Sequence, residues 1–339
     1  MNIYEVDLDY ESYLFDKNYL ENSPQSKKII NEFEYVFFLI NQDEDCFLKN
    51  SRNYDKNYLE RLRKNGFIIP HFTAENSGIK KWWGNHHNYN LEKELNSKIT
   101  SSQMALKHDW GFWHGMVVDS VSMARLHMKK NPSINHWILK KPHSFSGIGH
   151  YQFEREKFNE FILSKIITSP VLMEPLYKRH IDIGTTFVLK NGSIERQFMV
   201  QNHNVDQGGF RGGVAAPDVD KFKKYILENY QYDLSELEHI TQRIAEEYIK
   251  LGAIKNIQID SFIYESEGQL KLYPLVEVNY RKTMGLVMQA LSDKYQRLIE
   301  WKVNSKKEID NDPNFYSDKE MLRLSPDGTH FQTYLKYLS

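Results

Sequence analysis

Three oxygen-bearing side chains lie near one another in the final third of the chain: Asp260, Glu277 and Asn279. Residues 256–264 and 269–279 are rich in β-branched, aromatic and other apolar residues, and a turn signal separates them, so we expect a hairpin of two strands. Glu277 and Asn279 are two positions apart on a strand and therefore face the same side. Such an all-oxygen cluster suits a hard cation, Mg²⁺ or alternatively Mn²⁺, held partly by the phosphates of a nucleotide.

A second feature is a Gly/Ser-rich loop, 142–149, between predicted strands at 136–141 and 151–153. Glycines let backbone N–H groups close over a phosphate, and serines add hydroxyls. The small residues in question are Ser144, Ser146, Gly147 and Gly149. The loop is not a Walker A motif, and two glycines in a hairpin more often form only a turn.

The order of the first cluster resembles the metal-binding end of the ATP-grasp superfamily. Asp260, an apolar hairpin and then Glu277-Val-Asn279-Tyr-Arg281 follow one another as they do there, although Tyr280 stands where a proline is common. By this resemblance, Asp260, Glu277 and Asn279 hold Mg²⁺ on the phosphates of ATP. Arg281 is then the catalytic arginine that steadies the transferring phosphate.

The same resemblance gives roles to two lysines. Lys98 lies at the start of a predicted helix, 96–107, where a cation is disfavoured unless an anion is nearby. The family often has a lysine here that reaches the phosphates, whereas an exposed lysine is the ordinary alternative. Lys141 precedes the loop and is assigned to phosphate contact and catalysis, with Lys140, on the opposite face of the strand, as the alternative.

Glu174 and Asp182 resemble the hinge residues between the two ATP-binding lobes of the family, where a glutamate and the following backbone meet adenine and a later acidic residue meets ribose. An edge-strand carboxylate is the alternative for Glu174. Arg211 lies in a stretch, 207–213, with four glycines. We expect either a mobile loop in which Arg211 binds a carboxylate or phosphate during catalysis, or a flexible connection.

The resemblance implies an α+β fold, with two α/β lobes that sandwich ATP and a small α/β domain before them. The divisions expected are an amino-terminal domain at 1–95, a first lobe at 96–173, a second lobe with the metal site at 174–300, and a tail at 301–339.

Several element predictions are independent of the resemblance. We expect a buried strand at 35–40, a helix at 57–64, a short strand at 67–69 and a helix at 286–301. Pro274 cannot donate to a strand ladder, so the hairpin should contain a bulge.

Composition excludes several protein classes. The chain has 339 residues, 40% of them hydrophobic, and its 44 Lys and Arg nearly balance its 45 Asp and Glu, so no strong field favours nucleic acid or an anionic membrane. A single cysteine excludes an internal disulfide framework. No secretory or membrane-spanning segment is visible in the sequence, so we expect a cytoplasmic protein, with a homodimer as the commonest default.

These expectations combine into a functional hypothesis. The family's commonest reaction uses ATP to activate a carboxylate as an acyl phosphate, which an amine then attacks. We therefore expect a carboxylate–amine ligase, with an amino acid or short peptide as substrate and ATP and Mg²⁺ as cofactors. The alternatives are a small-molecule kinase on the same scaffold and a nucleotide-binding module without turnover.

Overall fold

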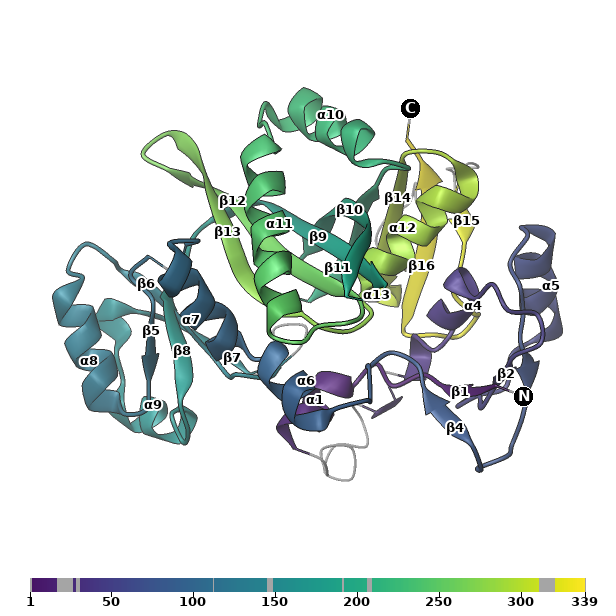
Figure 1. Cartoon of the computed structure of the whole chain (residues 1–339), viewed down its shortest axis with the longest axis horizontal. Helices are drawn as coiled ribbons and strands as arrows, with labels where there is room; N and C mark the ends of the chain where they lie inside the picture. Colours follow the sequence, from purple (N-terminus) through teal and green to yellow (C-terminus); the bar gives the residue numbers. More distant parts are fainter. Residues whose placement is uncertain are drawn as a thin grey trace.

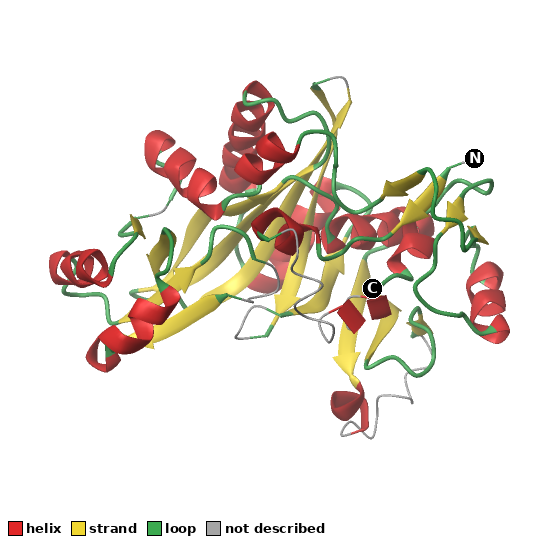
Figure 2. Ribbon diagram, turned by 90° about the horizontal axis from the view of Figure 1, so that it is seen from below, coloured by secondary structure: helices red, strands yellow, loops and turns green. Residues whose placement is uncertain are grey.

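The computed structural model describes residues 2–16, 27–28, 31–111, 113–144, 149–190, 192–205, 209–310 and 321–338. Within these residues, three β-sheets with helices packed on them give the mixed α and β architecture that was expected (Figure 1). The large sheet lies in the middle of the molecule, with one small sheet at each end, as the ribbon in Figure 2 also shows from below.

The amino-terminal sheet is parallel, in the order β3-β2-β1-β4. Its strands are β1 (Ile3–Glu5), β2 (Phe47–Leu48), β3 (His71–Phe72) and β4 (Ile79–Lys81). The helices that accompany it are α1 (Tyr10–Phe15), α4 (Val36–Ile40), α5 (Lys56–Lys64) and α6 (Tyr89–Leu95).

Two predictions in this region were wrong and one is confirmed. Residues 36–40 form α4 rather than a strand. The prediction failed because a short apolar run that is buried on all sides has the same sequence pattern in a helix and in a strand. The strand expected at 67–69 is instead β3, a few residues later. The helix expected at 57–64 is α5, which the Asp55 side chain caps.

The second small sheet is antiparallel, in the order β5-β8-β6-β7. Its strands are β5 (Met116–Val118), β6 (His136–Lys140), β7 (His150–Glu154) and β8 (Val171–Pro175). Helices α7 (Lys98–His108), α8 (Val121–Lys130) and α9 (Glu160–Ile166) and the short helix η1 (Arg155–Lys157) belong to this part of the chain. In Figure 1, α7 lies between this sheet and the large one.

The large sheet has eight strands in the order β13-β12-β9-β10-β11-β14-β16-β15. The strands are β9 (Arg179–Lys190), β10 (Ser193–Asn204), β11 (Phe210–Ala215), β12 (Ile257–Ser266), β13 (Gln269–Asn279), β14 (Ile299–Ser305), β15 (Leu322–Arg323) and β16 (Phe331–Tyr337). The helices associated with it are α10 (Val219–Tyr230), α11 (Ser235–Lys250), α12 (Met284–Tyr295) and α13 (Lys306–Asp310).

The carboxyl-terminal part differs from the expectation of a helix over 286–301. Helix α12 ends at Tyr295 because Gln296 adopts a left-handed conformation, with φ of 51°. The chain then enters β14, so Trp301 lies in a strand and is fully buried. Strands β14 and β16 extend the large sheet beyond β11.

The two ends of the described chain share one hydrophobic core. Buried side chains of α4 and α5 pack in the same cluster as those of β14 and β16. Tyr35 Oη and Thr333 Oγ1 are 2.7 Å apart, and Tyr58 Oη donates to the Leu324 carbonyl at 3.0 Å. The amino-terminal sheet is therefore anchored on the last strands of the large sheet.

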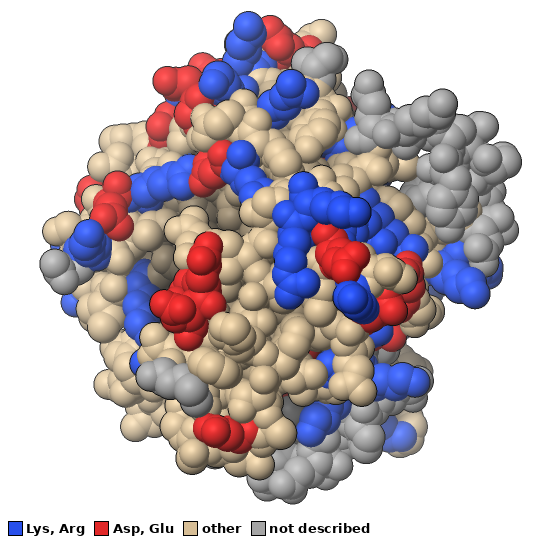
Figure 3. Space-filling view, turned by 90° about the vertical axis from the view of Figure 1, so that its right-hand side faces the viewer, with Lys and Arg blue, Asp and Glu red and all other residues tan. Residues whose placement is uncertain are grey.

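Charges of both signs are interspersed on the face shown in Figure 3, as the balanced composition predicted. None of the helices in the described residues combines the length and the apolar character that crossing a bilayer requires.

Candidate functional site

The β12–β13 hairpin places two carboxylates directly opposite each other. Asp260 pairs with Glu277, and Asn279 is two residues further along the same face of β13. The predicted bulge is confirmed, because the register shifts between Asp260 and Phe262, beside Pro274. Like charges directly opposite each other on neighbouring strands are destabilising. The hairpin therefore carries a local electrostatic cost at this point.

Hydrogen bonds fix Asp260. Asn279 Nδ2 donates to Asp260 Oδ2 at 2.8 Å, and Gln258 Nε2 donates to Asp260 Oδ1 at 2.7 Å. Burial raises the pKa of the Asp260 carboxyl above its ordinary range, and the facing Glu277 charge raises it further. Asp182, on the neighbouring strand β9, also raises the pKa of Asp260.

Lys98 compensates the charge of Glu277. Ser97 caps α7, and the buried Lys98 side chain places Nζ 2.6 Å from Glu277 Oε2. Lys98 Nζ also donates to the Ser144 carbonyl at 2.9 Å. Burial lowers the pKa of Lys98, but Glu277 and Glu11 outweigh it and raise the pKa above its ordinary value. In the same way, burial raises the pKa of Glu277, but Lys98 outweighs it and holds the pKa low.

Arg281 joins this group from the end of β13. Its Nη2 donates to Asn279 Oδ1 at 2.9 Å, and its Nε donates to Glu11 Oε1 at 2.8 Å. Glu11 lies on α1, far away in the sequence, and was not predicted. We call Glu11, Lys98, Asp260, Glu277, Asn279 and Arg281 the charged cluster.

A small pocket lies next to the charged cluster. At one wall, Lys140 Nζ forms a buried ion pair with Glu174, and Tyr273 Oη donates to Glu174 Oε1 at 2.7 Å. The Phe262 and Tyr273 rings stack, with centroids 4.7 Å apart. Lys140 is close enough to help lower the pKa of Glu277. The residues that line this aromatic pocket are Ile138, Lys140, Glu174, Pro175, Leu176, Tyr177, Arg179, Phe262 and Tyr273.

The predicted hinge residues differ in their surroundings. Glu174 lines the aromatic pocket. Asp182 pairs with Phe262 across β9 and β12, and its carboxylate accepts from Arg179 Nη1 at 2.7 Å and from Asn204 Nδ2 at 3.2 Å. The structure therefore places both carboxylates near the aromatic rings, although Asp182 lies outside the pocket wall.

Lys140 and Lys141 point to different surroundings, as their alternation on a strand predicts. Lys140, which was the alternative, is the lysine in the aromatic pocket. Lys141 Nζ instead lies 5.4 Å from the centroid of the Phe15 ring. Its assignment to phosphate contact stays a prediction that rests on the resemblance alone.

The Gly/Ser-rich loop is described in part. Ser146 and Gly147 lie outside the described residues. Gly149 has a φ of 82°, which glycine adopts without strain, and Ser144 is buried with its carbonyl on Lys98. Among the described residues, Ser144 Oγ has no hydrogen-bond partner.

Arg211 is not brought together with the charged cluster. It lies on β11, which is separated from β12 by β9 and β10, about 14 Å at the usual strand spacing. Its Nε is 3.5 Å from Glu308 Oε1, and its guanidinium lies over the Phe331 ring. Residues 210–213 form a strand and not a loop. A Cβ on Gly212 would lie 1.8 Å from the Trp301 carbonyl oxygen, which explains the glycine by close packing.

His150 is another residue that sequence reasoning missed. It opens β7 directly opposite Lys140 on β6. Burial lowers its pKa to about 3, and the nearby Lys140 and Lys98 charges contribute. Its place directly after the glycine of the loop was the one available signal in the sequence.

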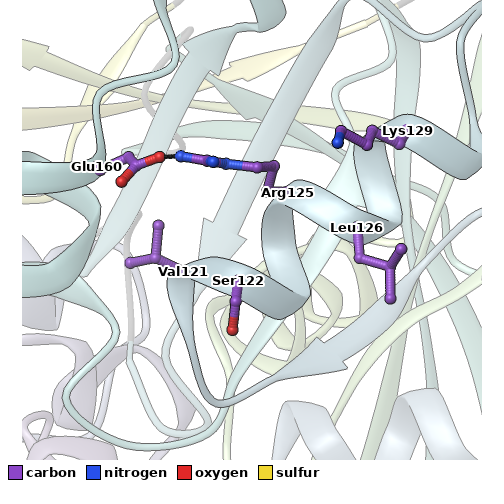
Figure 4. A pocket seen from close by; sticks show the side chains of 6 residues that line it. All are labelled: Val121, Ser122, Arg125, Leu126, Lys129 and Glu160. Carbon is purple, nitrogen blue, oxygen red and sulfur yellow. Dashed lines mark ion pairs between the residues drawn. The ribbon is translucent and has the colours of Figure 1, made fainter.

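One other pocket contains no part of this arrangement. A second pocket lies between α8 and α9, where Arg125 forms an ion pair with Glu160 (Figure 4). No residue of the charged cluster lines that pocket. Among the described residues, no group of three or more His, Cys, Asp and Glu side chains is arranged to hold a metal ion by itself. A cation at Asp260 and Glu277 would therefore need further ligands from a bound molecule.

No family model and no curated protein sequence matches this chain. Solved structures do match it over nearly its whole length. N5-carboxyaminoimidazole synthetase from Staphylococcus aureus, complexed with ADP, superposes with a TM-score of 0.57 at 10% identity, covering 100% of this chain and 93% of that one. Biotin carboxylase from Campylobacter jejuni, in a β-γ-ATP complex, superposes with a TM-score of 0.55 at 9% identity, covering 99% of this chain and 87% of that one. Carboxyaminoimidazole ribonucleotide synthase from Aspergillus clavatus, complexed with ATP, superposes with a TM-score of 0.53 at 9% identity, covering 99% of this chain and 94% of that one.

Proposed function

Because this chain has the ATP-grasp fold, we propose that it is an ATP-dependent carboxylate–amine ligase. The observation that carries the proposal is the position of the charged cluster beside an aromatic pocket. Two facing carboxylates, a buried lysine and an arginine lie next to a pocket with stacked rings and one buried ion pair. The charged cluster suits the triphosphate of a nucleotide, and the aromatic pocket, whose volume of about 20 Å³ holds about one water molecule, must widen to take the base.

The proposed place of ATP follows from the chemistry of each group. The aromatic pocket offers apolar rings for adenine, with Lys140 and Glu174 as polar groups at its wall. Asp182 is assigned to the ribose hydroxyls, because its carboxylate lies on the strand next to Phe262. Lys98 and the Gly/Ser-rich loop, with Lys141, are assigned to the phosphates.

The residues present fit a divalent cation. Asp260 and Glu277 are facing carboxylates with the Asn279 amide beside them, which is a set of hard oxygen donors. Burial and, after it, the facing Glu277 charge raise the pKa of Asp260, and a cation at this point would relieve the repulsion between the two carboxylates. When bound there with ATP, Mg²⁺ supplies charge neutralisation of the phosphates.

The proposed reaction has two steps. First, a carboxylate oxygen of the substrate attacks the γ-phosphorus of ATP, the bond from that phosphorus to the bridging oxygen breaks, and ADP leaves. Second, the nitrogen of an amine attacks the acyl carbon and loses a proton, and phosphate leaves as the C–N bond forms. Lys98 and Arg281 are assigned to the charge that develops on the phosphoryl oxygens. A small-molecule or peptide carboxylate and an amine are the expected substrates.

A screen for ADP release tests the proposal. The purified protein is incubated with MgATP and pairs of carboxylates and amines, starting from amino acids and dipeptides, and ADP is measured by a coupled assay. A ligase requires both co-substrates, and ¹⁸O in the carboxylate appears in the released phosphate. ADP release with a hydroxyl compound alone would make the protein a kinase. Nucleotide binding without ADP release under any pair would make it a binding module.

A further inference from the structure

Arg281 is held in place by three different groups. Its Nε and Nη2 both donate to Glu11 Oε1, at 2.8 and 2.5 Å, and Nη2 also donates to Asn279 Oδ1 at 2.9 Å. Its Nη1 donates to the backbone carbonyl of Lys282 at 2.9 Å. Among these partners in the described residues, Glu11 is the carboxylate, and it comes from a different part of the fold.

Glu11 lies within the charged cluster and away from solvent. Its side chain is 6% exposed and that of Arg281 is 14% exposed, so water screens this ion pair little. Glu11 also contributes to the raised pKa of Lys98, which shows that its charge acts on the same group of residues. A helix that otherwise belongs to the amino-terminal region therefore carries one of the charges of the candidate site.

The backbone of Glu11 is fixed by packing and not by the arginine. Tyr10 Oη donates to the buried Glu92 carboxylate on α6, and Tyr89 Oη donates to the Leu14 carbonyl at 3.1 Å. Helix α6 in turn leads to Asn96, whose Oδ1 accepts from the backbone N–H of Tyr280 at 2.8 Å. In Figure 1, α1 and α6 lie together below the large sheet. Glu11 and Arg281 are thus attached to one continuous set of contacts.

We propose that Glu11 is a positioning residue for Arg281, so that the amino-terminal helix α1 sets the direction of the arginine that acts on the transferring phosphate. This inference rests on the proposed function. An arginine side chain loses rotamer entropy when it is fixed. A guanidinium that is already held loses less on binding and needs no reorganisation during phosphoryl transfer.

A purely structural role for the pair would give a different result. A buried ion pair is weak evidence for stability, and its loss by itself predicts only a less stable protein. A positioning role predicts in addition that loss of the pair weakens the binding of ATP, which has a γ-phosphate, more than the binding of ADP, which lacks one. The readout is therefore the ratio of the ATP and ADP dissociation constants, measured by calorimetry with Mg²⁺ present.

The variants are Glu11→Gln, Arg281→Met and the double variant. Glutamine has nearly the same shape as glutamate but no charge. We expect Glu11→Gln to weaken ATP binding relative to ADP binding by about tenfold. Arg281→Met is expected to weaken ATP binding relative to ADP binding in the same way. In the double variant, Glu11→Gln should not weaken it further. Glu34→Gln is the matched control, because Glu34 is a buried carboxylate of the same region that accepts from Ser51 N and Tyr54 Oη. The ratio of the ATP and ADP dissociation constants of Glu34→Gln should equal that of the wild type.

The outcomes separate the two proposals. Equal weakening of ATP and ADP by Glu11→Gln, or an undiminished effect of Glu11→Gln in the Arg281→Met background, overturns the positioning role and leaves the proposed function intact. No nucleotide binding by the wild type overturns both. If Glu11→Gln does not fold, Glu11→Asp, which keeps the charge but shortens the reach by one methylene, gives the same comparison.

Discussion

Lys98 Nζ lies 2.6 Å from Glu277 Oε2, so a lysine assigned to phosphate and a carboxylate assigned to a cation are partners of each other. Both side chains are largely shielded from water, with exposed fractions of 4% and 24%. In the proposed function, each of them interacts with the Mg²⁺–phosphate group of the nucleotide. The positive lysine and the negative carboxylate therefore neutralise each other before MgATP binds.

Glu277→Gln is expected to weaken Mg²⁺-dependent ATP binding by about tenfold, because it removes one of two charged oxygen donors. Calorimetric titration of ATP with and without Mg²⁺ measures the effect. Glu265→Gln is the control, since Glu265 is an exposed carboxylate of the same hairpin. Unchanged binding in Glu277→Gln would contradict the assignment of Glu277 as a ligand.

Lys98→Met is expected to lower the free energy of unfolding by about 3–5 kcal/mol, because it leaves the Glu277 carboxylate without its buried partner. The double variant Lys98→Met/Glu277→Gln should regain part of this loss, since it removes the uncompensated charge as well. Urea unfolding of the three proteins gives the comparison. A double variant that is less stable than Lys98→Met would show that the pair is not coupled in this way.

Lys140 and Lys141 can be separated by matched substitutions. Lys140 lines the aromatic pocket beside Glu174, whereas Lys141 lies over Phe15, so Lys140→Met should weaken ATP binding more than Lys141→Met. The expected difference is about tenfold for a charged contact. The opposite order would show that the phosphate contact assigned to Lys141 contributes more to ATP binding than the pocket contact of Lys140.

His150 gives a prediction for acid stability. Burial and the nearby lysines lower its folded pKa from 6.5 to about 3, so between these values the unfolded chain binds a proton that the folded chain does not. The free energy of unfolding therefore falls as the pH falls through this window, by about 2.5 kcal/mol between pH 7 and pH 4.5. Urea unfolding of His150→Gln at pH 7 and pH 4.5 should show a smaller loss than the wild type. An identical loss in both proteins would place the acid sensitivity elsewhere.

The parts of the site that could be predicted come from local patterns in the sequence. Asp260, Glu277 and Asn279 lie on one hairpin, so strand alternation was enough to put Glu277 and Asn279 on one face. The choice between Lys140 and Lys141 required the twist and packing of the strand, which alternation alone does not give. Glu11 is 270 residues away from Arg281, and no local pattern connects a six-residue helix with a strand so distant.

The fold shows the same limit. The α+β architecture was implied by the family resemblance, whereas the hairpin of β12 and β13 followed from strand composition and a turn signal. Residues 36–40 were assigned to a strand, because a short run of buried apolar residues has no periodicity that separates it from a helix. The first residues of β14, 299–301, were assigned to the preceding helix, because the left-handed turn at Gln296 has no glycine to mark it.

The contact between Tyr35 and Thr333 has a consequence for synthesis of the protein on the ribosome. The strands that bury the side chains of α4 and α5 are made nearly 300 residues after α4. The core around α4 and α5 therefore stays incomplete for about 15–60 seconds at the usual synthesis rate of about 5–20 residues per second. During that interval the apolar side chains of α4 and α5 lack the strands that bury them in the folded protein, and a chaperone can bind them.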